Sequence, residues 1–196
     1  MELYEVVLFT HIAVVLAAFA LTGAIHVSEW LTVRASTVQE MRILSKPMAW
    51  GVLFAPVVAL LLFLGAWLVQ LSDDRAAAEY SFSDGWVWTA AVVLAFAFVA
   101  GFALEGPAAQ RLGKALAEAP DGPATAELRA QASEPLPWLV GHAVPFMIVG
   151  VVSNMVNKPG TAVSLLVIAV GAMVGLLLGW LGLRQARALA PGAATS

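Results

Sequence analysis

The segment that decides the fold is Glu5–Val33, which reads EVVLFTHIAVVLAAFALTGAIHVSEWLTV. It is apolar and long enough to cross a bilayer as one α-helix, because about 20 residues span the hydrocarbon core. Polar side chains fall on one face of this helix, in a pattern of threes and fours that joins His11, Val15, Ala18, Thr22, His26 and Glu29. Ionisable groups inside a membrane are costly and usually face a bundle interior, where they mark a cofactor, an ion path or a proton site.

The composition of the whole chain predicts an integral membrane protein. Of its 196 residues, 61% are hydrophobic and 12% are charged, with a mean hydropathy of +0.86, whereas soluble domains are about 25% charged. The absence of cysteine excludes disulfides, Cys-ligated zinc, iron–sulfur clusters and c-type haem attachment. The net charge of −3, without a basic tract, argues against a nucleic-acid partner. The first residues lack the basic region of a signal peptide, so the first helix is expected in the mature protein.

Apolar runs separated by turn signals predict an all-α fold, a polytopic membrane helix bundle with five transmembrane helices in a single membrane domain, residues 1–196. The expected spans are residues 5–33, 48–71, 86–105, 138–156 and 161–183. Basic residues gather in the first and third loops and in the tail, so the positive-inside rule predicts an outside N-terminus and an inside C-terminus. Trp30 and Trp138 are expected in an aromatic belt at the inner interface.

Turn and capping signals predict how the spans are connected. Thr37 and Glu40 have the spacing of a capping box for a short helix after the first span. Gly106-Pro107 is expected to interrupt the third span at its end, and residues 157–160 leave room only for a tight hairpin. The cytoplasmic loop 107–137 is expected to open with an amphipathic helix on the membrane surface.

Small residues and prolines predict how the helices pack. Pro145 is expected to kink the fourth span and to free a backbone carbonyl. The last span carries a stripe of small residues that lets helix backbones approach closely: Gly171, Gly175, Gly179 and Gly182. This stripe serves either packing within the chain or a homo-oligomer interface through Gly171, Gly175 and Gly179.

Depth arithmetic places four candidate ligands in one layer of the inner leaflet. With a rise of about 1.5 Å per residue, His11 and His26 lie about 22 Å apart along the helix axis, so they cannot hold one ion. His26 and Glu29 share the inner layer with Glu105 at the end of the third span and His142 near the start of the fourth. His11 belongs to the outer leaflet. It either forms an interhelical hydrogen bond or binds a haem iron, which is then five-coordinate or has an Asn, a Met or a water molecule as its sixth ligand.

Three interpretations of the inner layer compete. In the first, His26 and His142 are the axial ligands of a haem b. In the second, His26, Glu29, Glu105 and His142 bind a divalent metal such as Zn, Fe or Mn. In the third no cofactor binds: the histidines hydrogen-bond across helices, while the carboxylates pair with Arg34, Arg111 or a helix end.

The polar positions also resemble those of a known superfamily. The resemblance rests on Thr10–Ile12, His26, Met41–Leu44, Lys46–Met48 and the hairpin Asn157–Gly160. These positions resemble the superfamily that holds the HemJ-type protoporphyrinogen oxidases and the copper-resistance protein D membrane domain, and most closely a related family of uncharacterised small bacterial integral membrane proteins. The resemblance implies a small helical bundle that binds haem b, with His11 matching the haem ligand in the first span of the HemJ-type proteins.

The sequence thus leaves three classes of function open. The first is a redox-type membrane protein that binds haem b, or another His-ligated cofactor, through His11, His26 and His142. The second is an ion, proton or small-solute transporter, or an accessory membrane subunit, that uses the His/Glu stripe without a cofactor. The third is a scaffold for a membrane partner subunit. The lipid bilayer is the expected partner in each case, and the bacterial inner (plasma) membrane the expected location.

Overall fold

The computed structural model describes residues 2–73 and 80–188, and these residues form helices without a β-strand. Five helical stretches are long and apolar enough to cross a membrane, which confirms the all-α prediction and its five apolar helices. The elements in chain order are α1 (Leu3–Arg34), α2 (Val38–Leu44), the 3₁₀-helix η1 (Lys46–Leu53), α3 (Phe54–Asp73), α4 (Gly85–Ala100), the π-helix η2 (Gly101–Glu105), α5 (Gly106–Glu118), α6 (Ala126–Ala132), α7 (Pro135–Asn157) and α8 (Thr161–Ala188).

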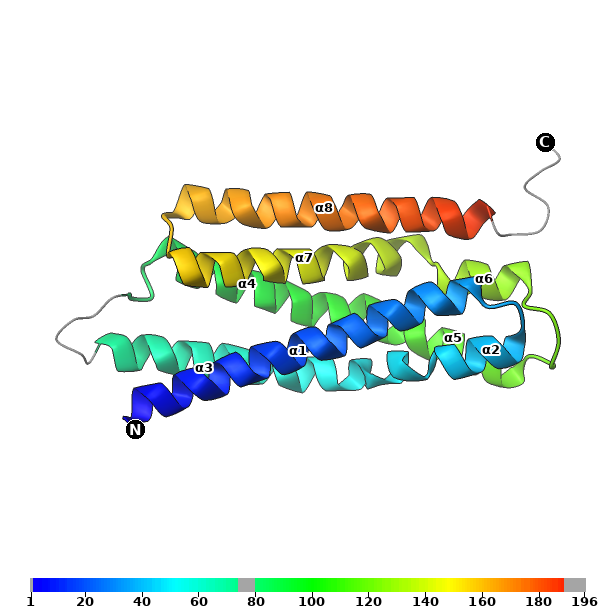
Figure 1. Ribbon diagram of the computed structural model, residues 1–196, viewed down its shortest axis with the longest axis horizontal. Helices are drawn as coiled ribbons and strands as arrows, with labels where there is room; N and C mark the ends of the chain where they lie inside the picture. Colours follow the sequence, from blue (N-terminus) through cyan, green and yellow to red (C-terminus); the bar gives the residue numbers. More distant parts are fainter. Residues whose placement is uncertain (1, 74–79, 189–196) are drawn as a thin grey trace.

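The long helices run side by side along the length of the molecule (Figure 1). The most extensive packing is between α7 and α8, which form an antiparallel hairpin; α1 packs on α3, and α4 packs on α7. The hairpin turn is as tight as the sequence predicts, because α7 ends at Asn157 and α8 begins at Thr161. Lys158 closes α7 in the left-handed conformation, with φ of 47°, and its N–H donates to the carbonyl of Asn154.

The short helices α2, α5 and α6 cover one end of the bundle (Figure 1). We call it the basic end, because five basic residues lie there: Arg34, Arg42, Arg111, Lys114 and Arg129. The amphipathic helix predicted after the third span is present as α5. Its apolar face is buried within the protein, since Leu112 and Leu116 belong to the same buried cluster as Val38 and Met41 of α2. The basic end is therefore a folded cap with its own small core.

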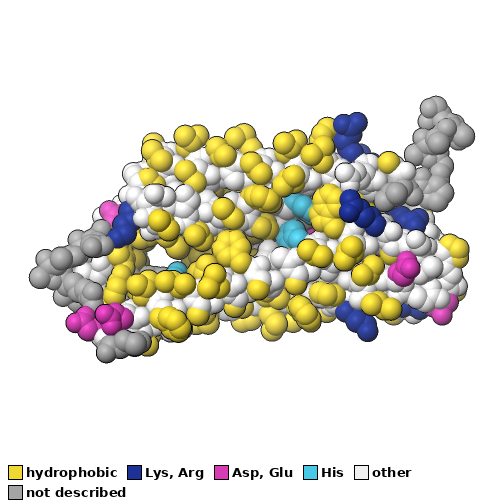
Figure 2. Space-filling model, viewed as in Figure 1, with side chains coloured by type: hydrophobic (Ala, Val, Ile, Leu, Met, Phe, Trp, Pro, Cys, Tyr) yellow, Lys and Arg dark blue, Asp and Glu magenta, His cyan; other side chains and the backbone are white. Residues whose placement is uncertain are grey.

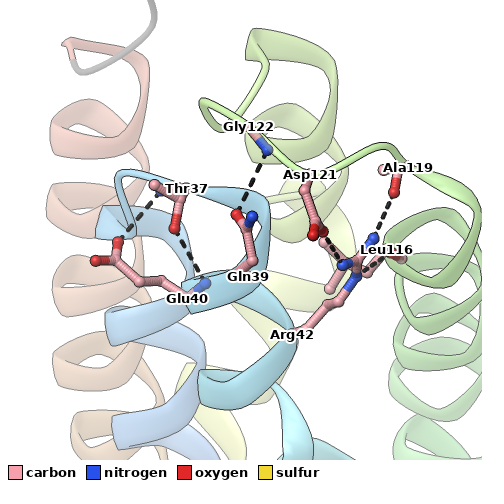
Figure 3. A network of polar contacts seen from close by, with 8 residues as sticks. All are labelled: Thr37, Gln39, Glu40, Arg42, Leu116, Ala119, Asp121 and Gly122. Atoms are coloured by element: carbon pink, nitrogen blue, oxygen red, sulfur yellow. Dashed lines mark hydrogen bonds and ion pairs between the residues drawn. The ribbon is translucent and has the colours of Figure 1, made fainter.

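The cap is fixed by side chains that satisfy backbone groups (Figure 3). The predicted capping box at the start of α2 is confirmed: Glu40 N–H donates to Thr37 Oγ1, and Thr37 N–H donates to Glu40 Oε2, both at 3.2 Å. The guanidinium of Arg42 bridges to the end of α5, where it donates to Asp121 Oδ1 at 2.5 Å and to the carbonyls of Leu116 and Ala119. Each contact pairs a polar group that the helix ends leave open.

Two stretches depart from the expected regular helices. The second span was expected from residue 48, yet residues 46–53 form the 3₁₀-helix η1 and the α-helix starts only at Phe54. The break expected at Gly106-Pro107 is wrong, because the helix continues from α4 into α5. The π-helix η2 makes this continuation possible: Gly106 N–H donates to the carbonyl of Gly101, and Pro107 then occupies a first-turn position where it needs no N–H.

The surface matches what a bilayer requires. Hydrophobic side chains cover the body of the molecule, and most of the visible Lys and Arg side chains gather at the right-hand end, over the basic end (Figure 2). Along the long helices, large apolar residues such as Phe9 and Phe63 are 70% and 61% exposed. Such exposure is unfavourable in water and favourable in lipid, so the structure is that expected of a multi-pass membrane protein.

Candidate functional site

The residues predicted to share one layer come together from three spans. One ligand atom each of His26 and Glu29 on α1 and His142 on α7 lie within 4.8 Å of one another. Glu105 on η2 lies beside the same place, with its carboxyl carbon 3.6 Å from the position that a Cβ would take on Gly141. The polar face of the first span and the end of the third thus meet at α7.

His26 ties α1 to α7 through a carbonyl that a proline leaves open. Its Nε2 lies 2.6 Å from the carbonyl oxygen of Gly141, and its Nδ1 lies 2.8 Å from the carbonyl oxygen of Thr22. In an α-helix the carbonyl of Gly141 would accept from residue 145, but this residue is Pro145, which has no N–H. The carbonyl predicted to be freed by Pro145 is therefore the one that His26 contacts.

The two contacts of His26 have a consequence for charge. A carbonyl oxygen only accepts, so both contacts are hydrogen bonds only when both ring nitrogens carry protons and the imidazole is positively charged. Glu29 lies one helical turn away, and its Oε2 is buried without a hydrogen-bond partner. When the carboxyl groups of Glu29 and Glu105 are both ionised as well, His26, Glu29 and Glu105 together carry a net charge of minus one.

The alternative in which arginines neutralise these carboxylates differs from what the structure shows. Arg34 donates to Gln185 Oε1 at 2.7 Å, and its guanidinium stacks over the ring of Trp30. Arg111 pairs with Glu134 at 2.6 Å. Neither arginine is thus engaged with Glu29 or Glu105, and both of these residues line a cavity.

His142 is held in a single tautomer by two neighbours. Its Nδ1 lies 2.8 Å from the carbonyl oxygen of Trp138, so Nδ1 carries the proton, and its Nε2 accepts from the indole N–H of Trp30 at 2.8 Å. The ring also stacks on Trp138, with centroids 4.6 Å apart. Trp30 and Trp138, expected in an interfacial belt, therefore pack inside the bundle against His142.

The glycine stripe of α8 makes room for this arrangement. A Cβ on Gly179 would lie 3.1 Å from the Cβ of His142, and one on Gly182 would lie 2.9 Å from Cζ2 of Trp30. The close approach also brings the carbonyl of Gly179 within 2.9 Å of Trp138 Nε1, which donates to it. Gly171 and Gly175 contact the backbone of α7 in the same way. The stripe thus serves packing within the chain, the first of the two predicted alternatives.

The charged cluster forms one end of a large cavity. This cavity has a volume of about 1020 Å³, and His26, Glu29 and Glu105 line it together with residues of η1, α4, η2, α5 and α7. The volume is that of a site for a small organic molecule. Most of the wall is apolar, so the polar groups that a ligand could contact lie in the cluster and at the rim at the basic end.

His11 lies apart from this cluster, as its depth predicts. It is buried with its Nδ1 unpaired, and it borders a second cavity of about 30 Å³ whose other lining residues are almost all apolar. Val15 and Ala18 line this second cavity together with Val58, Leu61 and Leu94. Thr22, Phe54 and Pro145 line both cavities, so the two cavities share part of their walls, while the side chains of the stripe between His11 and Thr22 are apolar.

The geometry does not fit a haem at either predicted position. The rings of His26 and His142 touch edge to face, with centroids 5.1 Å apart, so no porphyrin fits between them. The cavity at His11 is far smaller than a porphyrin. A metal ion would need nitrogen ligands at about 2.0–2.1 Å, so the three ligand atoms would have to move closer and Trp30 would have to release His142. Haem and metal binding stay predictions of the sequence.

Sequence reasoning missed two groups that decide the state of the site, the indole of Trp30 and the ring of Trp138. It predicted the carbonyl freed by Pro145 but not the contact of this carbonyl with His26. A signal for the tryptophans was present, because Trp30 follows His26 by four residues and Trp138 precedes His142 by four, which places each pair on one helix face. The signal for the carbonyl was Pro145, four residues after Gly141.

Fold and site together define a helical, multi-pass membrane protein with a charged cavity at the basic end of its bundle. A comparison with protein-family models, with curated proteins and with solved structures found no match. The function of the protein is therefore inferred from the residues of this chain.

Proposed function

We propose that this integral membrane protein binds a ligand with a single positive charge in the cavity beside Glu29 and Glu105. In this proposal the protein transports ions or small solutes and has no resident cofactor. The observation that carries the proposal is the pair of carboxyl groups of Glu29 and Glu105, which line a cavity of about 1020 Å³ and of which Glu29 has its Oε2 buried without a hydrogen-bond partner. A buried polar atom without a partner is costly, and a cation in the cavity removes that cost.

The proposed single positive charge follows from one set of charge states. When both carboxyl groups are ionised and both ring nitrogens of His26 carry protons, one negative charge is left over, and it matches a monovalent cation or a proton. Glu134, which also lines the cavity, is already paired with Arg111. With the basic end in the cytoplasm, as the positive-inside rule predicts, the cavity lies in the cytoplasmic leaflet of a plasma membrane.

Calorimetric titration of the purified protein with K⁺, tetramethylammonium and tetraphenylphosphonium tests the proposal. We expect at least one of these cations to bind, and Glu29→Gln or Glu105→Gln to weaken binding about tenfold or more, which is about 1.4 kcal/mol. The matched control is Glu118→Gln, because this exposed carboxylate lies on α5 outside the cavity. Wild-type affinity in both cavity variants, or no binding of any cation, would refute the proposal.

A divalent metal is the second candidate, since one ligand atom each of His26, Glu29 and His142 lie within 4.8 Å of one another. Elemental analysis of the purified protein, followed by Zn²⁺ titration, separates this candidate from the first. Haem binding remains the prediction of the sequence resemblance, and a visible absorption spectrum of the oxidised and dithionite-reduced protein tests it. A Soret band that disappears in His11→Ala or His26→Ala would support haem over both candidates.

A further inference from the structure

The large cavity borders two different surfaces of the molecule. At the basic end its rim includes the exposed polar side chains of Lys46 and Gln110. Along the side of the bundle its wall includes Val52 of η1 and Phe102 of η2, which are 77% and 74% exposed. In a chain whose helices face hydrocarbon, exposed apolar side chains at the edge of a cavity mark an opening toward lipid.

The backbone on both sides of this lateral opening is irregular. Within residues 2–73 and 80–188, η1 is the only 3₁₀-helix and η2 the only π-helix, and both contribute to the wall of the cavity. Irregular helix at membrane depth is tolerated where it lines a cavity, and π-helical turns are frequent at functional sites. Gly101 of η2 lets the start of α3 approach closely, since a Cβ there would lie 3.1 Å from Cδ1 of Phe54.

We infer that the ligand of this cavity is a lipophilic cation that enters from the bilayer between η1 and η2, with its apolar part against Val52 and Phe102 and its charge at Glu29 and Glu105. The inference rests on the proposed cation site and adds the ligand class and the route. The chemistry of the wall supports it, because a mostly apolar cavity lined by two carboxyl groups complements an apolar molecule with one positive charge.

The affinity test compares two monovalent cations that differ in lipophilicity. In the protein reconstituted into phosphatidylcholine vesicles, we expect tetraphenylphosphonium to bind at least tenfold more tightly than tetramethylammonium, and Glu29→Gln to remove most of the difference. Equal, Glu29-dependent binding of the two cations would overturn the inference and leave the proposed function standing. Binding of both cations that is unaffected by Glu29→Gln would overturn the proposed function itself.

The route is tested by narrowing the lateral opening. Val52→Trp adds bulk at the opening, and we expect it to slow tetraphenylphosphonium association about tenfold while leaving tetramethylammonium unaffected. The matched control is Leu53→Trp, since Leu53 is also on η1 and 50% exposed but does not line the cavity. Equal association rates in the two variants, with both folded by circular dichroism, would overturn the lipid route.

A spectroscopic readout is independent of ligand affinity. Because the chain has no cysteine, Ala103→Cys on η2 and Gln110→Cys on α5 each give one labelling site in the cavity wall. We expect a bimane label at residue 103 to be quenched by brominated lipid and a label at residue 110 by aqueous iodide. Quenching at residue 103 by iodide alone would show that the opening faces water and would overturn the inference.

Discussion

The Nε2 atom of His26 lies 2.6 Å from the carbonyl oxygen of Gly141, across the boundary between α1 and α7. Pro145 explains the contact, because it removes the N–H that this carbonyl would otherwise receive within the helix. A histidine that the sequence offers as a cofactor ligand is thereby also an interhelical hydrogen-bond donor, and these two roles use the same nitrogen.

This relationship predicts coupling between His26 and Pro145. His26→Ala leaves a carbonyl unpaired in a low-dielectric interior, and we expect it to lower the free energy of unfolding by about 1–3 kcal/mol. In the Pro145→Ala background the new N–H pairs with Gly141, so His26→Ala should cost less. A double-mutant cycle of SDS-induced unfolding, followed by circular dichroism, measures the coupling. Strictly additive costs would show that the two residues are independent.

Trp30 controls whether His142 is available as a ligand. Trp30→Phe removes the N–H that His142 Nε2 accepts, so the lone pair becomes free for a metal ion. We expect about tenfold tighter Zn²⁺ binding in this variant by calorimetric titration, a change of about 1.4 kcal/mol. Trp50→Phe is the control, because Trp50 lies on η1 and is 51% exposed. Unchanged Zn²⁺ affinity in Trp30→Phe would mean that this hydrogen bond does not limit metal binding.

Two glycines on different helices should respond oppositely to alanine. In Gly182→Ala the new methyl group would lie 2.9–3.0 Å from the rings of Trp30 and Trp138, so overpacking should cost about 1–3 kcal/mol of unfolding free energy. Gly23 on α1 has open space at the corresponding position, and alanine there should stabilise the helix by up to about 1 kcal/mol. Unfolding in SDS measures both, and equal effects would contradict the proposed packing of α8.

The contacts of Arg42 predict an unequal response within one ion pair. Arg42→Ala removes the donors of two carbonyls as well as the salt bridge, and we expect it to lower the free energy of unfolding by about 1–3 kcal/mol. Asp121→Asn removes only the exposed salt bridge, which is worth about 1 kcal/mol or less. Limited proteolysis after α5 gives a second readout. Equal loss in the two variants would assign the stability of the cap to the ion pair.

The sequence predicted the parts of this structure that depend on periodicity and length. The stripe from His11 to Glu29 follows the helical repeat, and the depth arithmetic that placed Glu105 and His142 in the layer of His26 needs only the rise per residue. These two features place residues from three spans in one layer, whereas their being within reach of each other was an assumption. The same arithmetic separated His11 from the others, and in the structure His11 lines the smaller cavity while His26 and Glu29 line the larger one.

The parts that the sequence did not predict depend on how the helices are rotated about their axes. The pairing of Trp30 with His142 requires α1 to face α7 at one angle, and no periodic pattern specifies that angle. The irregular helices were missed for a different reason: residues 46–53 and 101–105 have no composition that distinguishes 3₁₀ or π hydrogen bonding from α. The sequence predicts a break at Pro107, because a proline inside a regular helix would lack a needed N–H. Only the π-helix before it places Pro107 in a first turn, where no N–H is needed.

The position of the site along the chain also sets the order in which it is completed during biosynthesis. His26 and Gly141 are 115 residues apart, so at roughly 5–20 residues per second the ribosome needs about ten seconds to make the partner of a histidine that has already been synthesised. Throughout that interval α1 carries His26 without the carbonyl of Gly141 that its Nε2 contacts in the finished protein. The apolar first helix is thus inserted well before the helix that completes the hydrogen bonding of its histidine.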